Sequence, residues 1–204
     1  YASSVTVNTG IAVQVGDLIV LSVQNDTMDT SALPTVTDAA ANTFQDTPSQ
    51  LGADGRTGRL IGMYATASAA AAGYSVTVSF PRTVNGCRVQ VIVYRGASSW
   101  TYDSGAFDHD AQTFDTAAVT VGPFNATAGP VIVAAQNSYQ GPDNIICSSS
   151  DYTDNGKVND DGLQVFDRIP TVALSGETFT LDDAGTSQGG YHRLSYIVFS
   201  FEAA

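Results

Sequence analysis

The stretch Cys87-Arg-Val-Gln-Val-Ile-Val-Tyr94 decides the fold class of this chain. It places valine at positions 89, 91 and 93, so one set of side chains faces a core and the intervening set faces away from it. The same alternation returns in Tyr74-Ser-Val-Thr-Val-Ser-Phe80 and in His192-Arg-Leu-Ser-Tyr-Ile-Val-Phe-Ser-Phe201. Because β-branched and aromatic residues at this spacing favour a pleated, half-buried backbone, these stretches predict antiparallel strands.

Short runs of this kind, separated by Gly, Asn, Asp and Pro, continue along all 204 residues. The ten or eleven runs predict an all-β, jelly-roll-like sandwich of two antiparallel sheets, in a single domain over residues 1–204. The one helix-like patch, Ala69-Ala-Ala-Ala72, is too short for a stable helix. We expect the core to include these residues: Leu18, Val20, Val76, Val78, Val89, Val91, Val93, Val131, Val133, Ile197 and Phe199.

The charge balance argues against several classes of partner. The chain has 20 acidic and 8 basic residues, and a net charge of −12 disfavours both nucleic acid and anionic membranes. No segment approaches the about 20 consecutive apolar residues of a membrane span, so we expect none. Aspartate supplies 18 of the 20 acids, which suits a turn-rich β protein. Abundant aspartate with a single lysine, Lys157, predicts an extracellular, cell-surface or virion-surface location.

Cysteine chemistry contributes little to the interpretation. The chain has two cysteines, Cys87 and Cys147, which permit one disulfide at most. We expect two free, partly buried thiols, with a disulfide as the alternative. The paired Cys-x-x-Cys spacing that is typical of zinc sites does not occur.

Short motifs follow one another in a fixed order, and they stand in this chain as Gly16-Asp-Leu-Ile-Val20, Val36-Thr-Asp-Ala-Ala-Ala-Asn-Thr-Phe44, Met63-Tyr-Ala65, Ser75-Val-Thr-Val78, Val91-Ile-Val-Tyr-Arg-Gly96 and Tyr196-Ile-Val-Phe-Ser-Phe201. The ordered set resembles a domain of bacterial secreted proteins and phage virion proteins that is described as Ig-like or lectin-like. This resemblance implies a β-sandwich displayed outside the cell or on a virion, and it brings no catalytic residues. The chain departs from the pattern at Ala41, where the pattern has glycine, so this hairpin can use a different turn.

An Asp-rich stretch near residue 155 resembles the start of a calcium-binding loop, because oxygen donors alternate before a glycine. The candidate Ca²⁺ ligands are Asp151, Thr153, Asp154, Asn155, Asp160 and Asp161. An EF-hand needs glutamate at the position where Gly162 stands, so the motif predicts a calcium site in a β-loop instead. An ordinary Asx-rich loop is the alternative.

A second acidic stretch, Asp108-His-Asp110 followed by Asp115, is an alternative metal site. In a strand, Asp108 and Asp110 would share one face and His109 would point away. In a loop, the carboxylates would be able to converge on one cation. A solvated polar loop and an acid–base role for His109 are the other interpretations.

Aromatic residues stand beside carboxylates in the segment Ala97–Asp115, which we expect to be a long loop. Trp100 and Tyr102 can stack on a sugar ring, while Asp103 accepts hydrogen bonds from its hydroxyl groups. In the other interpretation, Trp100 and Phe107 close one end of the sandwich and bind nothing.

These observations predict a non-catalytic structural or interaction module of a coat, fibre or filament, whose partners are copies of itself or other surface proteins. A carbohydrate-binding adhesion module that recognises glycans is the alternative. A polysaccharide hydrolase is the third possibility, and it would need two carboxylates brought together from distant parts of the chain. The segment Tyr1–Gly10 alternates as a terminal strand does, and it pairs either within its own sheet or with a neighbouring copy.

Overall fold

The structure is a computed structural model that describes residues 2–25, 33–51, 59–84, 86–111, 118–137, 145–158, 162–183 and 194–204. These residues form fifteen β-strands in four antiparallel sheets, and no helix occurs among them. The predicted all-β class is therefore confirmed, with four sheets in place of two and more strands than the sequence suggested. In the described part of the chain, nothing helical has the length and apolar character needed to cross a bilayer.

The first seven strands form what we call the N-terminal unit. Its strands are β1 (Ala2–Asn8), β2 (Leu18–Asn25), β3 (Thr35–Asp38), β4 (Gln45–Leu51), β5 (Arg59–Thr66), β6 (Ser75–Val84) and β7 (Cys87–Tyr94). An outer sheet has the order β1-β6-β3, and a second sheet has the order β4-β5-β2-β7. The N-terminal strand β1 pairs with β6, from Ala2 opposite Val84 to Asn8 opposite Ser75, so pairing within its own sheet is confirmed.

The remaining strands form the C-terminal unit. They are β8 (Trp100–Ala111), β9 (Ala118–Ala126), β10 (Val131–Asn137), β11 (Ile145–Cys147), β12 (Thr153–Val158), β13 (Leu163–Arg168), β14 (Leu174–Asp183) and β15 (Leu194–Ala203). One sheet has the order β12-β13-β10-β15-β8, and the outer sheet has the order β11-β14-β9. The segment Ala97–Asp115, which we expected to be a long loop, therefore contains strand β8.

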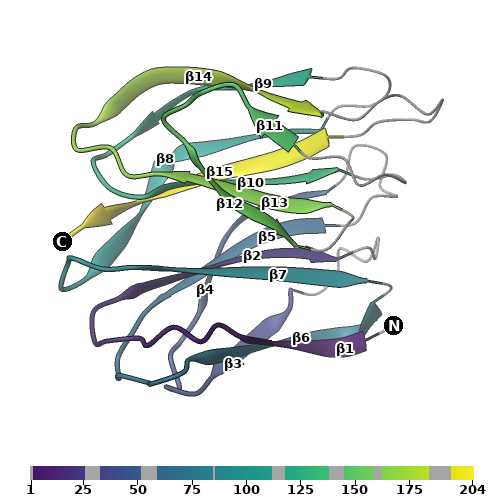
Figure 1. Ribbon diagram of the computed structural model, residues 1–204, viewed down its shortest axis with the longest axis vertical. Helices are drawn as coiled ribbons and strands as arrows, with labels where there is room; N and C mark the ends of the chain where they lie inside the picture. The colour runs from purple at the N-terminus through teal and green to yellow at the C-terminus, as the bar shows by residue number, and fades with distance from the viewer. Residues whose placement is uncertain are drawn as a thin grey trace.

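The four sheets lie on one another as four layers, with the two larger sheets in the middle (Figure 1). One buried cluster fills the N-terminal unit and includes Ile19, Leu21 and Val76. Another fills the C-terminal unit and includes Val133, Leu181 and Val198. A third, which we call the shared cluster, lies between the two central sheets, and its buried members are Leu18, Val20, Leu60, Tyr94, Ile132, Ala134, Leu163, Val165, Ile197, Phe199 and Phe201. The two stacked sandwiches are thus joined by a core of their own.

The two units repeat one topology. If β9–β15 are matched in order with β1–β7, the sheet β9-β14-β11 reproduces β1-β6-β3, and β12-β13-β10-β15 reproduces β4-β5-β2-β7. The contacts between the units agree with this matching. Strand β15 contacts β4 and β5, and its counterpart β7 contacts β12 and β13, the counterparts of β4 and β5. Strand β8 is the one addition, and it pairs with the outer edge of β15. The chain therefore holds a structural duplication whose halves meet through equivalent faces, as around a two-fold axis.

Residue pairing supports this duplication. Leu18 lies opposite Tyr94 in the N-terminal unit, and Ile132 lies opposite Phe199 in the C-terminal unit. All four side chains belong to the shared cluster. In sequence, Val89-Gln-Val-Ile-Val-Tyr94 aligns on this basis with Leu194-Ser-Tyr-Ile-Val-Phe199, which keeps the Ile-Val pair and the aromatic residue after it.

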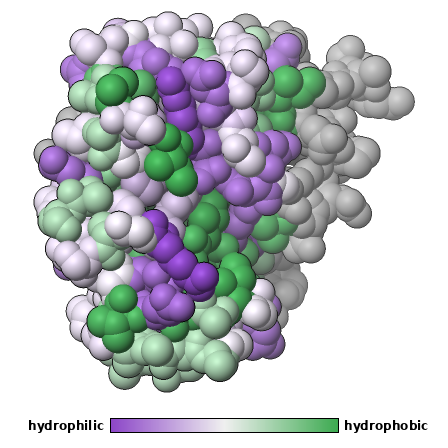
Figure 2. Space-filling model, turned by 60° about the vertical axis from the view of Figure 1, so that its left-hand side comes forward, coloured by the Kyte–Doolittle hydropathy of each residue, from purple (hydrophilic) through white to green (hydrophobic). Residues whose placement is uncertain are grey.

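Most of the predicted core residues are buried, and Val91 and Val93 of β7 are half-buried. Exposed large aliphatic residues are few in the described part of the chain, and they are Ile11, Val15, Leu33, Ile146, Ile169 and Val172. Figure 2 shows one face of the molecule on which hydrophobic residues lie scattered among hydrophilic ones. Scattered apolar residues of this kind are normal for a folded surface.

Replacing Phe199 in the shared cluster tests whether the two units unfold together. We expect Phe199→Ala to lower the free energy of unfolding by about 3–5 kcal/mol, because it leaves a cavity between the central sheets. Since both units border that cavity, urea unfolding followed by circular dichroism and by tryptophan fluorescence should shift as one transition. Val172→Ala is the control, because the Val172 side chain is 69% exposed and its loss should change little. Two transitions, only one of which moves, would contradict the shared core.

Candidate ligand-binding groove

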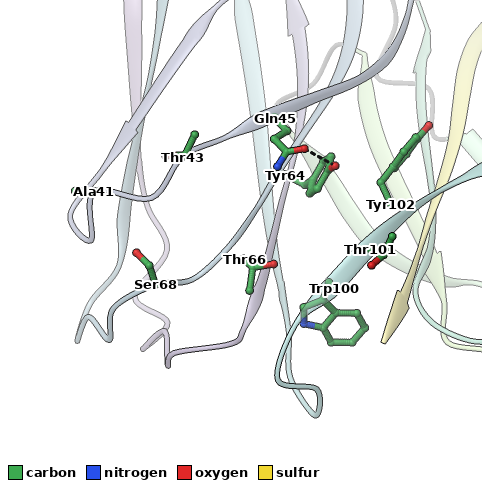
Figure 3. A pocket seen from close by; sticks show the side chains of 9 residues that line it. All are labelled: Ala41, Thr43, Gln45, Tyr64, Thr66, Ser68, Trp100, Thr101 and Tyr102. Atoms are coloured by element: carbon green, nitrogen blue, oxygen red, sulfur yellow. Dashed lines mark hydrogen bonds between the residues drawn. The ribbon is translucent and has the colours of Figure 1, made fainter. Parts of the chain in front are cut away.

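A groove opens beside the edge of the sheet β4-β5-β2-β7, where the first residues of β8 pass over it (Figure 3). Its volume is about 440 Å³, within the range of roughly 300–1,000 Å³ that small-molecule sites occupy. The lining residues are Ala41, Thr43, Gln45, Tyr64, Thr66, Ser68, Trp100, Thr101 and Tyr102. They come from both units, so the groove exists only because the duplicated halves are packed together.

Trp100 is held in place at one end of the groove. Its indole Nε1 donates a hydrogen bond to the backbone oxygen of Gly16 at 3.0 Å. The ring also packs against the edge of the shared cluster and is half-buried. Trp100 therefore packs against the shared cluster and lines the groove at the same time.

Two tyrosines, Tyr64 and Tyr102, lie next to each other in the groove, with Tyr102 on the side away from Ala41 (Figure 3). The rings of Tyr64 and Tyr102 are stacked, with centroids 5.8 Å apart and an interplanar angle of 20°. Both rings contact Phe201 edge-on, with centroid distances of 4.9 Å from Tyr64 and 5.9 Å from Tyr102. The Tyr64 hydroxyl donates to Gln45 Oε1 at 2.8 Å, so this ring is fixed by stacking and by a hydrogen bond.

The opposite wall is shaped by the turn after β3. Asp38 accepts hydrogen bonds from the backbone nitrogen of Asn42 at 2.9 Å, from Asn42 Nδ2 at 2.7 Å and from the Tyr74 hydroxyl. Asn42 Oδ1 in turn accepts from the backbone nitrogen and the hydroxyl of Ser68, at 2.8 and 2.9 Å. These contacts hold Ala41 and Ser68 against the groove, so the Val36–Phe44 motif builds this wall.

The turn also shows what happens at Ala41. Its φ angle is +54°, in the left-handed region that favours glycine. The turn thus places an alanine in a backbone conformation that glycine adopts more readily.

Contacts of Asp17 fix the turn whose Gly16 oxygen accepts the hydrogen bond from Trp100. The carboxylate of Asp17 is almost fully buried, and it accepts hydrogen bonds from the backbone nitrogen of Gln14 at 2.9 Å and from Arg95 Nε at 3.1 Å. Arg95 also donates to the backbone oxygen of Ala12. The Gly16-Asp17 turn and the Tyr94-Arg-Gly96 turn are thereby joined, and this junction presents the Gly16 oxygen to Trp100.

The groove is polar but uncharged, since none of its lining residues is acidic or basic. Burial, reinforced by the nearby Tyr64 and Asp103, raises the pKa of Tyr102 to about 12, and burial also raises the pKa of Tyr64. Both phenols therefore remain neutral at physiological pH. The Tyr102 hydroxyl is enclosed and has no hydrogen-bond partner among the described residues.

The structure brings together two of the three residues that the sequence suggested for carbohydrate binding. Trp100 and Tyr102 line the groove, whereas Asp103 does not. One carboxylate oxygen of Asp103 accepts hydrogen bonds from the backbone nitrogen of Thr127 at 2.8 Å and from the hydroxyl of Ser200 at 3.2 Å. Sequence reasoning missed Tyr64, whose motif Met63-Tyr-Ala65 marked a strand but gave no sign of its partner in β8. The side chain of Phe107 lies outside the described residues.

The Asp-rich segment around β12 is engaged in contacts within the protein. Asp154 accepts hydrogen bonds from the Gly156 backbone nitrogen and from Gln164 Nε2, both at 2.8 Å. Asp151 pairs with Arg168 at 3.0 Å, and Asn155 Nδ2 donates to Asp167 at 2.8 Å. Thr153 opens β12 opposite Asp167, while Asp160 and Asp161 lie outside the described residues.

The second acidic stretch falls within β8 rather than in a loop. The backbones of Asp108 and Asp110 pair with Val198 and Tyr196 of β15, and Asp115 lies outside the described residues. Among the residues that the structure describes, no three of His, Cys, Asp and Glu lie together so as to hold a metal ion. A calcium site therefore remains a prediction from the sequence. Cys87 and Cys147 are partly buried and are not joined by a disulfide, as we expected.

Substituting Ala41 tests the cost of its left-handed backbone. We expect Ala41→Gly to stabilise the protein by up to about 1 kcal/mol, because glycine relieves a steric cost of about 1–2 kcal/mol that its extra unfolded-state entropy only partly offsets. The matched control is Ala40→Gly, since Ala40 has no positive φ and should lose about 0.5–1 kcal/mol. Thermal unfolding of both variants checks this expectation, and equal effects of the two glycines would contradict it.

Alkaline pH should destabilise the fold through buried tyrosines. Burial is the main cause that raises the pKa of Tyr64, Tyr74, Tyr94, Tyr102 and Tyr152 above 10.0. A raised pKa favours the neutral phenol in the folded state, so this stability is complete below pH 10 and is lost as the pH rises toward the folded-state values. Urea unfolding at several pH values should show this decline. In Tyr102→Phe the decline should be smaller, and an unchanged profile would contradict the assignment for Tyr102.

Comparison of the chain with protein-family models, with curated proteins and with solved structures finds no match. The resemblance of its ordered motifs to domains of secreted and virion proteins therefore stays a prediction from the sequence. The chemistry of the groove therefore follows from its lining residues and their geometry.

Proposed function

We propose that this protein is a non-catalytic module, displayed outside the cell, on the cell surface or on a virion, that binds neutral glycans in the groove between β5 and β8. The observation that carries the proposal is the meeting of three aromatic side chains, Tyr64, Trp100 and Tyr102, with uncharged hydrogen-bonding groups in one groove. Of the functions considered from the sequence, glycan recognition uses these residues most directly.

The aromatic residues suit the apolar faces of sugar rings. A pyranose presents C–H groups on its faces, which pack on the negative face of an aromatic ring, while its hydroxyl groups point outward. Trp100 and Tyr64 are already fixed by hydrogen bonds to Gly16 and Gln45, so little rotamer freedom is lost when a ligand binds. A preformed site of this kind supports affinity without a conformational change.

The polar lining suits the hydroxyl groups of the same ligand. Thr43, Thr66 and Thr101 supply hydroxyls that both donate and accept. The Ser68 hydroxyl donates to Asn42 and can still accept, and the Gln45 amide nitrogen can donate while its oxygen accepts from Tyr64. No lining residue is charged, and the chain has a net charge of −12. Acidic glycans would be repelled by that charge without a local cation to offset it, so a neutral glycan is the expected class.

The composition of the groove supports binding rather than hydrolysis. Glycosidases place two carboxyl groups on either side of the scissile bond. None of the described residues that line this groove carries a carboxylate, and Asp103, the nearest candidate from the sequence, is bonded to Thr127 and Ser200 instead. The groove offers stacking and hydrogen bonds, which are the interactions of a lectin-like site.

Removing the Tyr64 ring tests the proposal. Wild-type protein should bind members of a panel of neutral oligosaccharides, measured by a glycan array and then by calorimetry. Tyr64→Ala should weaken that binding about tenfold, equivalent to ~1.4 kcal/mol, because it removes one stacking platform. Trp100→Ala should do the same, and its thermal unfolding must be measured because the variant also loses the bond to Gly16.

Tyr102→Phe is the matched control for these variants. It keeps the ring and removes an enclosed hydroxyl that has no partner among the described residues, so glycan binding should be retained. Failure of the wild-type protein to bind any neutral glycan would contradict the proposal. Equal affinity of the wild-type protein and of a folded Tyr64→Ala variant would show that the glycan binds elsewhere.

A further inference from the structure

One strand position of the duplicated fold is occupied in the C-terminal unit but not by any described strand of the N-terminal unit. In the C-terminal unit, β8 pairs with the outer edge of β15, from Ala111 opposite Ser195 to Trp100 opposite Ala203. The equivalent strand of the N-terminal unit is β7, which ends the sheet β4-β5-β2-β7. No strand of the described residues covers its outer edge. The edge of β15 therefore has an added strand, whereas the equivalent edge of β7 has none among the described residues.

The side chains of β7 reflect this difference. Tyr196, Ile197, Val198 and Phe199 of β15 are all at most 2% exposed. Their counterparts Val91, Ile92 and Val93 in β7 are only half-buried, although they are as apolar. A strand paired with β7 would reduce the exposure of these residues.

The other edges of the two central sheets carry features that discourage strand addition. Strand β4 has Asp46 and Pro48, and its pairing with β5 is irregular after Asp46. Strand β12 has Asp154 and an irregularity after it. Strand β8 carries three aspartates, and its pairing with β15 is irregular between Val198 and Ser200.

Strand β7 has none of these features. It contains no acidic residue, lysine or proline, and all eight of its residues pair with β2 in unbroken register, from Tyr94 opposite Leu18 to Cys87 opposite Asn25. Its one charged residue, Arg88, is basic, and Arg95 follows the strand. Of the edge strands of the two central sheets, β7 is therefore the one without a carboxylate, which matters in a chain of net charge −12.

We propose that β7 is a self-association edge, at which the β7 strands of two copies of this chain pair antiparallel about a two-fold axis. The pairing joins two four-stranded sheets into one continuous sheet, and each copy satisfies the open edge of the other. The occupant is a second copy because antiparallel pairing of identical strands fills both edges in one contact, which a single added peptide does not.

This contact leaves the groove open. The groove lies at the β4 side of the sheet β4-β5-β2-β7, whereas β7 is its opposite edge. The two proposals are therefore independent, and a dimer formed through β7 presents two grooves. Two grooves on one particle would strengthen attachment to a glycan surface through multivalency.

Sedimentation velocity of the whole chain over a wide concentration range tests the association. We expect a reversible dimer, and Ile92→Lys should raise its dissociation constant at least about tenfold, because each copy then carries a lysine within the paired strand, which opposes strand addition. The control is Ile146→Lys, which places the same charge on an aliphatic residue of β11 that is 50% exposed, and it should leave the dimer unchanged.

Hydrogen exchange of the wild-type protein provides a second measurement that does not depend on a substitution. Amides of β7 should exchange more slowly at high than at low protein concentration, while those of β1 and β3 should not change. A chain that stays monomeric at the highest concentration overturns the proposal. So does a dimer in which β7 gains no protection, or one that a folded Ile92→Lys variant forms as well as Ile146→Lys does.

Discussion

Burial of two central sheets against each other is the constraint on which the rest of this structure depends. Strands β2 and β15 lie in those sheets, and they are buried on both faces over nearly their whole length. A strand of this kind needs apolar residues at consecutive positions, which is why Leu18–Val23 and Tyr196–Phe199 do not alternate strictly. The outer strand β6, with one face in water, keeps the alternation of Ser75–Phe80. The shared cluster thus explains both sequence patterns.

Polar contacts then fix how the units meet. The Tyr94 hydroxyl donates to Asp167 at 2.7 Å, and Gln90 Nε2 donates to the backbone oxygen of Asn155 at 2.8 Å, so both cross from one unit to the other. Burial and the neighbouring Asp167 carboxylate hold the pKa of Tyr94 well above its usual range. Directional bonds of this kind select one arrangement of two apolar surfaces that would otherwise be able to slide. The groove beside β8 is a consequence of that arrangement.

The two halves share their strand order and differ in strand β8. Both halves use the same strand order and present the same sheet to the shared cluster. Strand β8 exists only between them, and it both completes the sheet of the C-terminal unit and supplies Trp100 and Tyr102 to the groove. This added strand therefore accounts for the groove, and no described strand takes the equivalent place beside β7.

The sequence by itself determined the all-β class, most of the strands and most of the core, because period-two alternation reports which face of each strand is buried. It also singled out Trp100 and Tyr102, which line the groove, since aromatic residues beside polar ones are a local signal. It did not determine that four sheets stack, that β8 is a strand, or that Tyr64 faces Tyr102. Those features depend on pairing between residues far apart in the chain, as between Trp100 and Ala203, and on burial against a second unit. The spacing of residues along the chain does not specify partners that are distant in sequence, so only the tertiary structure decided these features.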